Sequence, residues 1–166
     1  MGFLYSGTDE APGNVGLWDQ VLALEWVNDN INYFGGDPNQ ITIVGESAGS
    51  WSVSFLILSP IARNLFKNAI MMSGSALNHL DSGEPDSVRQ KWLNGAKSIG
   101  CIDSENRFTP KIMKCLRDSS PELLSELIEG SELEDSNGWP PQVIIDGDFL
   151  PNRPLDMLKS GDYKRV

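Results

Sequence analysis

The chain has few side chains that bind metals or carry protons near neutral pH. Its 166 residues include one histidine, His79, and two cysteines, Cys101 and Cys115. A closed metal site usually takes four nitrogen or sulfur ligands, and none of these three residues stands at a ligand spacing. We therefore expect no metal and no cofactor.

Cationic side chains and long apolar runs are also scarce. Lys and Arg number 13 against 23 Asp and Glu, which gives a formal net charge of −10. This charge repels phosphate backbones, so nucleic acid is not an expected partner, although an acidic surface weakly attracts cationic substrates. The longest uninterrupted apolar runs, such as Phe55 to Leu58, are far shorter than the roughly 20 residues of a membrane span. We expect no span in this chain.

What the chain does contain is a Gly-x-Ser-x-Gly pattern at 45–49, between a β-prone stretch and the apolar run 51–58. Strand, sharp turn and helix in this order are typical of a nucleophile elbow. Ser47 would then expose its hydroxyl, and the N–H of Ala48 at the start of the helix could stabilise an oxyanion. Gly45 and Gly49 would let strand and helix pass without a Cβ clash. The alternative is a turn in which Ser47 merely caps the helix.

The segments around the elbow predict an α/β fold with a central parallel sheet flanked by helices. Apolar spacing indicates one long helix over 17–34, capped by Asn14 and ended by the glycines and proline of 35–38. We expect Gly2 to Tyr5 to be an interior strand, 6–14 a loop, and 68–72 the next parallel strand. The residues from Ser73 to His79 would follow that strand at the pocket.

The second half of the chain predicts smaller elements. Helices are expected over 86–99, over 111–117, and from a Ser120 cap to about 129, either as lid-like segments on the carboxyl side of the sheet or as ordinary surface cover. Residues 142–151 indicate a short strand and a turn. At the N-terminus, the first residues match a loose myristoylation pattern, but we favour an interior strand of a longer protein. They lack the features of a signal peptide.

Several stretches together resemble the type-B carboxylesterase and cholinesterase family, in the same order and with similar gaps. They are 14–20 (NVGLWDQ), 26–27 (WV), 34–38 (FGGDP), 45–49 (GESAG), 65–66 (LF), 73–74 (SG) and 146–151 (DGDFLP). The resemblance covers nearly the whole chain. It implies an α/β-hydrolase fold and hydrolysis of carboxylic esters through a serine, an acid and a histidine. Residues 1–166 would form a single partial domain, truncated at both ends.

The resemblance assigns roles to three neighbouring residues. Ser47 matches the nucleophile, Ala48 an oxyanion donor, and Glu46 a buried supporting acid beside the nucleophile. The triad acid and histidine have no match in the chain, so we expect it to be nearly inactive alone. His79 is weighed as a replacement base, but the order of the family's triad favours a pocket-lining or loop residue.

Cys101 and Cys115 resemble the two cysteines of a family disulfide, with two buried thiols as the alternative. A bridge would place the protein in an oxidising, secreted or extracellular setting, although no N-x-[ST] sequon supports secretion. Two functional classes remain. The first is an ester hydrolase acting on a small carboxylic ester, and the second is a non-catalytic cholinesterase-like adhesion or interaction module. Oligomeric state is not indicated.

Overall fold

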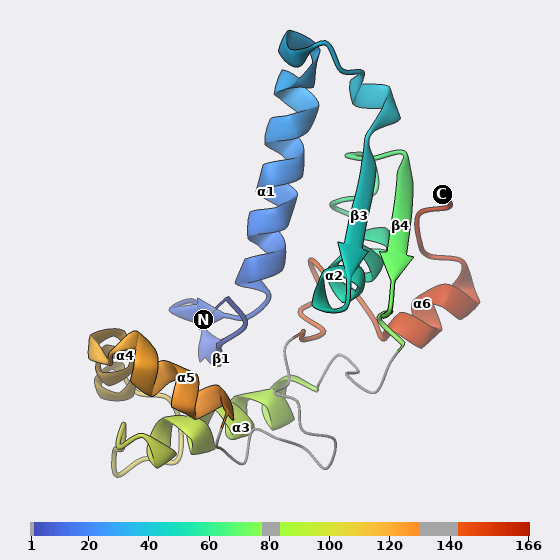
Figure 1. Ribbon diagram of the computed structural model, residues 1–166. Coiled ribbons are helices and arrows are strands. Elements are labelled where there is room, and N and C mark those ends of the chain that lie inside the picture. Colours follow the sequence, from blue (N-terminus) through green and yellow to red (C-terminus); the bar gives the residue numbers. More distant parts are fainter. Residues whose placement is uncertain (1, 78–83, 130–142) are drawn as a thin grey trace.

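The computed structural model describes residues 2–77, 84–129 and 143–166, without side-chain placements for 126–129 (Figure 1). Its strands are β1 (Tyr5–Thr8), β2 (Ala11–Pro12), β3 (Thr42–Glu46) and β4 (Asn68–Met72). Its α-helices are α1 (Val15–Asn30), α2 (Ala48–Leu58), α3 (Pro85–Ser98), α4 (Pro110–Asp118), α5 (Pro121–Glu129) and α6 (Pro154–Ser160). No helix within these ranges is long and apolar enough to cross a bilayer.

The centre of the structure is the parallel pair of strands β3 and β4. Val44 lies opposite Ile70 and Glu46 opposite Met72 in the register, and α2 packs against one face of the pair. The connection between the strands runs through α2, as a parallel crossover requires. The predicted α/β fold class and the predicted strands on both sides of the elbow helix are therefore confirmed.

The prediction of an interior strand at Gly2 to Tyr5 is wrong. The strand there is β1, which pairs antiparallel with β2 in a separate two-stranded sheet, so much of the expected loop 6–14 is a hairpin. The Ser6 side chain closes this hairpin by accepting the N–H of Thr8 at 3.1 Å and donating to the carbonyl of Ala11 at 3.2 Å. Local side-chain hydrogen bonds of this kind turn the chain back before it can join the central sheet.

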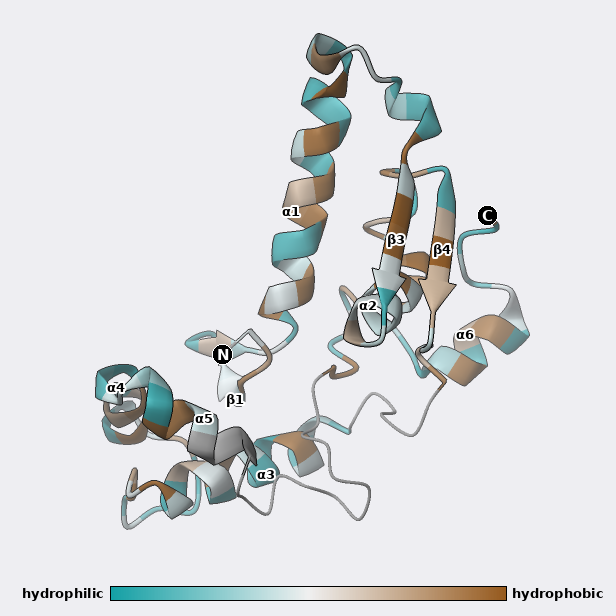
Figure 2. Ribbon diagram, in the orientation of Figure 1, coloured by the Kyte–Doolittle hydropathy of each residue, from teal (hydrophilic) through white to brown (hydrophobic). Residues whose placement is uncertain are grey.

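The predicted helix over 17–34 is two elements. The α-helix α1 ends at Asn30, and residues Ile31–Phe34 continue as the 3₁₀-helix η1, which Gly35 ends at φ 81°. A second short 3₁₀-helix, η2 (Pro38–Gln40), follows. Leu17 and Val21 are buried, whereas Trp26 is 57% exposed. Apolar residues recur along the length of α1 (Figure 2), but only Leu17 and Val21, near its start, are buried among the described residues.

Asn14 is the N-cap residue of α1, as predicted, but its side chain makes no capping bond and bonds elsewhere. Its amide donates to the Ile144 carbonyl at 2.9 Å and to Asp146 Oδ2 at 2.8 Å, and its oxygen accepts the N–H of Ile144 at 3.0 Å. Asn14 is fully buried and sits at φ 57°, in the left-handed region. It therefore fastens the start of α1 to a segment 130 positions away.

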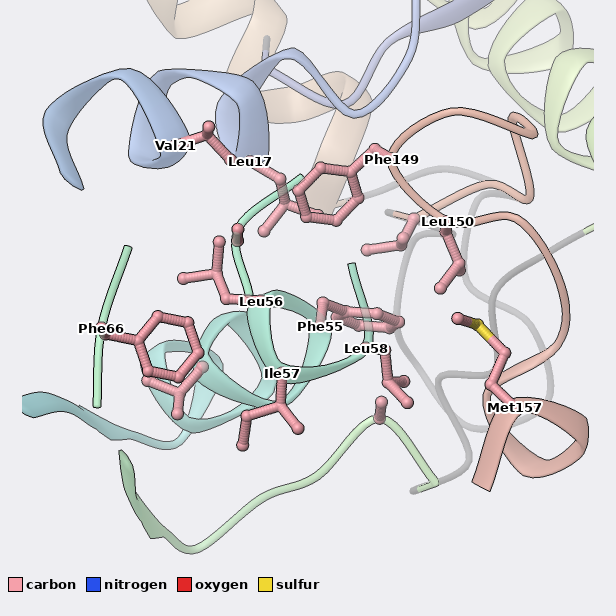
Figure 3. Packing of buried hydrophobic residues seen from close by; sticks show 14 residues of the cluster. Leu17, Val21, Phe55, Leu56, Ile57, Leu58, Phe66, Phe149, Leu150 and Met157 are labelled. Carbon is pink, nitrogen blue, oxygen red and sulfur yellow. The ribbon is translucent and has the colours of Figure 1, made fainter. Parts of the chain in front are cut away.

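Two hydrophobic clusters form the core. One gathers around α2, where side chains of α1, α2, α6 and the 149–150 segment converge (Figure 3). The other lies among α3, α4 and the N-terminal hairpin. Phe3 packs against both clusters. The hairpin and the segment that Asn14 holds therefore join the two halves of the described structure.

Helices α3, α4 and α5 lie where the sequence predicted helices, and one further helix is present. Ser120 caps α5 as expected, since its hydroxyl accepts the N–H of Leu123 at 3.2 Å. The described part of 142–151 is a turn, in which Asp146 Oδ1 accepts the N–H groups of Asp148 and Leu150. The helix α6, which ends at Gly161 with φ 77°, was not predicted.

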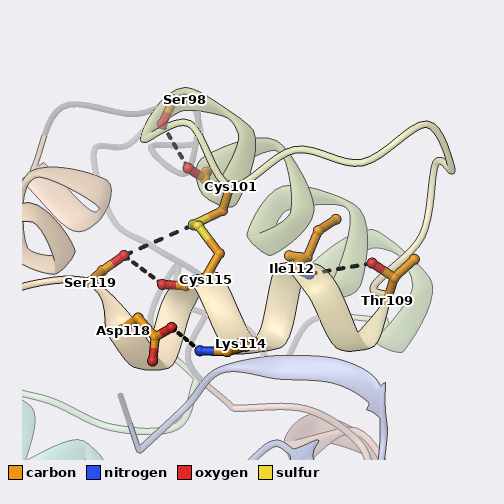
Figure 4. Close-up of a disulfide and its surroundings, with 9 residues drawn as sticks. Ser98, Cys101, Thr109, Ile112, Lys114, Cys115, Asp118 and Ser119 are labelled. Carbon is orange, nitrogen blue, oxygen red and sulfur yellow. Dashed lines mark hydrogen bonds and ion pairs between the residues drawn. A yellow bond between two sulfur atoms is a disulfide. The ribbon is translucent and has the colours of Figure 1, made fainter.

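The predicted disulfide is confirmed. Cys101 and Cys115, 14 positions apart, are bonded with their Cα atoms 5.6 Å from each other (Figure 4). The Ser119 hydroxyl donates to the Cys115 carbonyl at 2.8 Å beside the bridge. The bond fixes the segment just after α3 to α4, so the smaller cluster is held covalently as well as by packing.

Reduction of this bridge should destabilise the protein. A loop of this size removes enough entropy from the unfolded chain to contribute about 3 kcal/mol in the chain-entropy model. Guanidinium unfolding with and without a reductant should show that loss in the free energy of unfolding. A Cys101→Ala/Cys115→Ala variant should not respond to the reductant, and an equal response there would refute the assignment.

Two replacements of Asn14 should distinguish what its hydrogen bonds contribute to stability from what its backbone conformation costs. Asn14→Gly leaves the Ile144 peptide groups and Asp146 without their partner, which should lower the free energy of unfolding by at least about 3 kcal/mol. Asn14→Ala should lose about 1 kcal/mol more, because a Cβ disfavours positive φ. Chemical denaturation of both variants measures the difference. Equal stabilities would contradict the conformational part of this explanation.

Candidate active site

Ser47 occupies the turn between β3 and α2 in a strained backbone conformation. Its φ is 51° and its ψ is −117°, a region that a residue with a side chain occupies only when its surroundings enforce it. Its carbonyl accepts the first helical hydrogen bond, from the N–H of Trp51 at 3.1 Å, but its hydroxyl makes no capping bond. The helix-cap alternative is therefore wrong, and the hydroxyl is not used in holding the helix.

The close approach of β3 and α2 depends on Gly45. A Cβ on Gly45 would lie 2.1 Å from the carbonyl oxygen of Gly49, which is backbone and cannot move aside cheaply. The expectation for Gly49 itself is wrong, because a Cβ there would meet nothing within 4 Å among the described residues. Gly49 contributes its backbone to the contact, and Gly45 contributes the absence of a side chain.

The end of β4 supports the turn from the other side. The Ser47 N–H donates to the Met72 carbonyl at 2.9 Å, so this N–H is committed to the sheet. The next residue, Ser73, has φ 64°. A Cβ on Gly74 would lie 2.5 Å from Trp51 Nε1 and 3.0 Å from the Ser47 carbonyl oxygen. Strand, turn and helix are therefore packed at backbone distance around Ser47.

The start of α2 can stabilise a negative charge. Its first N–H groups have no acceptor one turn earlier in the helix, and they carry the positive end of the helix dipole. The Ala48 N–H is the first of these, and Ala48 is exposed. An oxyanion formed on a substrate carbonyl beside Ser47 would meet this donor.

A small cavity lies beside the elbow, with Ala48, Trp51 and Ser75 in its lining and a volume of about 30 Å³. That space holds a water molecule or two but not an acyl group.

The predicted site residues are only partly brought together. Glu46, Ser47 and Ala48 are consecutive at the end of β3 and the start of α2. Glu46 is exposed, which corrects the expectation of a buried acid: it lies on the sheet face that α2 does not cover. His79 lies outside the described residues. Among those that are described, no group of three or more His, Cys, Asp and Glu side chains is placed to hold a metal ion.

The residues that hold the turn in place were not predicted from the sequence. Ser50 and Ser54 bond to the segment after β4, and Gly74 allows its close approach. The available signal was the spacing of serines at 47, 50 and 54 in a mostly apolar stretch.

A strained serine between a parallel strand and a helix is the defining feature of the elbow in α/β hydrolases, and comparison with known proteins agrees. Residues 1–166 match the model of the "Carboxylesterase family" over their whole length. The chain belongs to this family, and its fold is that of an α/β hydrolase in part.

Similar curated proteins bear cholinesterase names. The chain is 39% identical to "Cholinesterase 1" of Branchiostoma lanceolatum, over 100% of this chain and 47% of the relative. It is 41% identical to "Acetylcholinesterase" of Leptinotarsa decemlineata, over 99% of this chain and 27% of the relative. For "Acetylcholinesterase" of Danio rerio the values are 39%, 99% and 26%. The chain thus spans about a quarter to a half of the length of these relatives.

The two glycines of the elbow should respond in opposite ways to the same substitution. Gly45→Ala places a Cβ against the Gly49 carbonyl and should prevent stable folding of the elbow. Gly49→Ala should leave the melting temperature unchanged or slightly raised, because alanine favours a helix by up to about 1 kcal/mol over glycine. Thermal unfolding followed by circular dichroism compares the two. A stable Gly45→Ala protein would contradict the described packing.

Proposed function

We propose that Ser47 is the nucleophile of a carboxylic ester hydrolase. The observation that carries this proposal is the strained backbone conformation of Ser47 at the start of a helix that its own hydroxyl does not cap. A serine that only stabilised the helix would not need that conformation. Membership of the carboxylesterase family supports the choice of esters as the substrate class.

The reaction follows from the groups at the elbow. Ser47 Oγ attacks the ester carbonyl carbon while a general base takes its proton, and the Ala48 N–H stabilises the oxyanion of the tetrahedral intermediate. Collapse of the intermediate expels the alcohol, which receives the proton from the base, and leaves an acyl group on Ser47. Water, deprotonated by the same base, then releases the acid and restores the serine.

The base and its acid partner come, in this proposal, from residues outside these 166. The single histidine of the chain, His79, follows the strand after the elbow, and the family's chain order places the triad acid before the histidine. The lengths of the relatives leave room for both, because this chain spans 47%, 27% and 26% of three of them. The chain alone is then nearly inactive, since a serine without a base is a poor nucleophile.

Glu46 has a supporting role in this proposal. Its exposed carboxylate directly precedes Ser47, so its negative charge favours a cationic group near the nucleophile, whether a protonated base or a cationic substrate. The net charge of −10 acts in the same direction over longer distances. Choline esters, which the names of the relatives suggest, and neutral carboxylic esters are both within the proposed class.

The proposed setting is extracellular or secreted. Its support is the bridge between Cys101 and Cys115, because such bonds form and persist mainly in oxidising compartments. A structural disulfide of this kind is rare in the cytosol.

Ser47→Ala should abolish covalent labelling by a fluorophosphonate and hydrolysis of acetylthiocholine and of a neutral nitrophenyl ester. The experiment uses the protein at the length that its gene encodes, established by intact mass, beside the 166-residue chain. Ser98→Ala, which removes a hydroxyl bound to the Gly95 carbonyl in α3, is the control and should keep both activities.

Labelling and turnover of the full-length protein distinguish an ester hydrolase from a non-catalytic interaction module. Labelling and turnover in the full-length protein, with loss of both in Ser47→Ala, support the hydrolase. A folded full-length protein whose Ser47 is neither labelled nor active would overturn it and favour the interaction module.

A further inference from the structure

Ser47, just before α2, and two serines on the same side of that helix all lie against the segment leaving β4. They stand at 47, 50 and 54, three and four positions apart, so they share a helix side. Their partners are Met72, Gly74 and Ala76, each two residues after the last. The start of α2 and the segment that follows β4 are thus joined by hydrogen bonds at a regular interval.

The three bonds are short and of different kinds. The Ser47 N–H donates to the Met72 carbonyl at 2.9 Å. The Ser50 hydroxyl donates to the Gly74 carbonyl at 2.7 Å, and the Ser54 hydroxyl accepts the Ala76 N–H at 2.9 Å. We call these three bonds the serine ladder.

The repeat lengths of the two backbones make such a ladder possible. A helix advances about 5 Å over three to four residues, and an extended chain advances about 6.6 Å over two. The positive φ of Ser73 bends the strand exit and shortens its advance. Helix and segment can therefore stay in step over three bonds.

The middle bond of the ladder is buried. Ser50 is 0% exposed, so its loss leaves the Gly74 carbonyl without a partner where water does not replace it easily. Gly74 also packs against the Trp51 indole and the Ser47 carbonyl. Movement of Gly74 towards the elbow therefore presses on the peptide group of Ser47.

The ladder also holds the far end of the segment. Ser75 lines the same small cavity as Ala48, and the Ala76 N–H next to it is held by Ser54. Displacement of 73–76 would change the wall beside the first N–H of α2. The backbone of the nucleophile and the surroundings of the oxyanion donor are thus both coupled to these hydroxyls.

We propose that Ser50 and Ser54 are positioning residues that hold residues 73–76 against the elbow and so fix the alignment of Ser47 for attack. This inference rests on the proposed esterase function. Neither hydroxyl touches the reacting atoms. Both act through the segment, so they affect the transition state more than the binding of substrate.

The test compares steady-state kinetics of variants in the protein at its encoded length, with a nitrophenyl ester as the probe. Ser50→Ala and Ser54→Ala should each lower kcat about tenfold or more and change KM less than about twofold. Ser54→Thr keeps a hydroxyl at a half-buried position and should restore most of kcat. Ser98→Ala loses a similar serine-to-carbonyl bond in α3 and should have the kcat of the unaltered protein.

A second readout does not depend on activity. Amide hydrogen exchange should be faster at Ala76 in Ser54→Ala than in the unaltered protein, and Ser54→Thr should restore the protection. Unchanged exchange at Ala76 would overturn the ladder itself. A lower melting temperature with unchanged kcat in the folded variants would overturn the positioning role and leave the ladder merely structural.

Failure of the proposed function has a separate signature. If the unaltered full-length protein does not hydrolyse the ester, the function fails, and the positioning role fails with it. If the unaltered protein is active and both alanine variants match it, only the positioning proposal is overturned.

Discussion

The backbone of Ser47 is the constraint on which the rest of the elbow depends. A φ of 51° with a ψ of −117° is unfavourable for serine in isolation, so neighbouring groups must supply the energy that maintains it. The hydrogen bond to Met72 and the close contact of Gly74 act on the Ser47 peptide groups directly, and the missing side chain at Gly45 lets β3 approach the backbone of Gly49 one turn into the helix. The local geometry is therefore a property of three elements together, and the five residues of the pattern do not determine it alone.

The same dependence explains how the two halves of the structure are connected. The cluster around α2 and the cluster around the disulfide share few side chains, and Phe3 is one of them. Asn14 adds a polar link between them, because Ile144 belongs to the smaller cluster while α1 packs on the larger one. A single buried amide thus couples the helix beside the elbow to the disulfide-bonded part.

The sequence predicted those parts whose causes are local. The β-prone residues 41–44, the glycines of the elbow, the Ser120 cap and the cysteine pair all carry their signal within a few positions or within a family pattern. The position of Asn14 is a contrasting case. Its neighbours indicated a cap, but its partners lie 130 positions away, and no local rule identifies them. The exposure of Glu46 and the antiparallel pairing of β1 likewise depend on where other segments pack. The helix α6 is too short for a periodic pattern to be visible.

The serine ladder has a consequence for the order of folding. All of its members lie in the continuous segment from 47 to 76, so the contacts that strain Ser47 close only short loops, which costs little entropy and can occur early. The Asn14 link closes a loop of 130 positions and belongs to the last stages. A chain emerging from the ribosome would accordingly assemble its elbow before the region that Asn14 later brings alongside it.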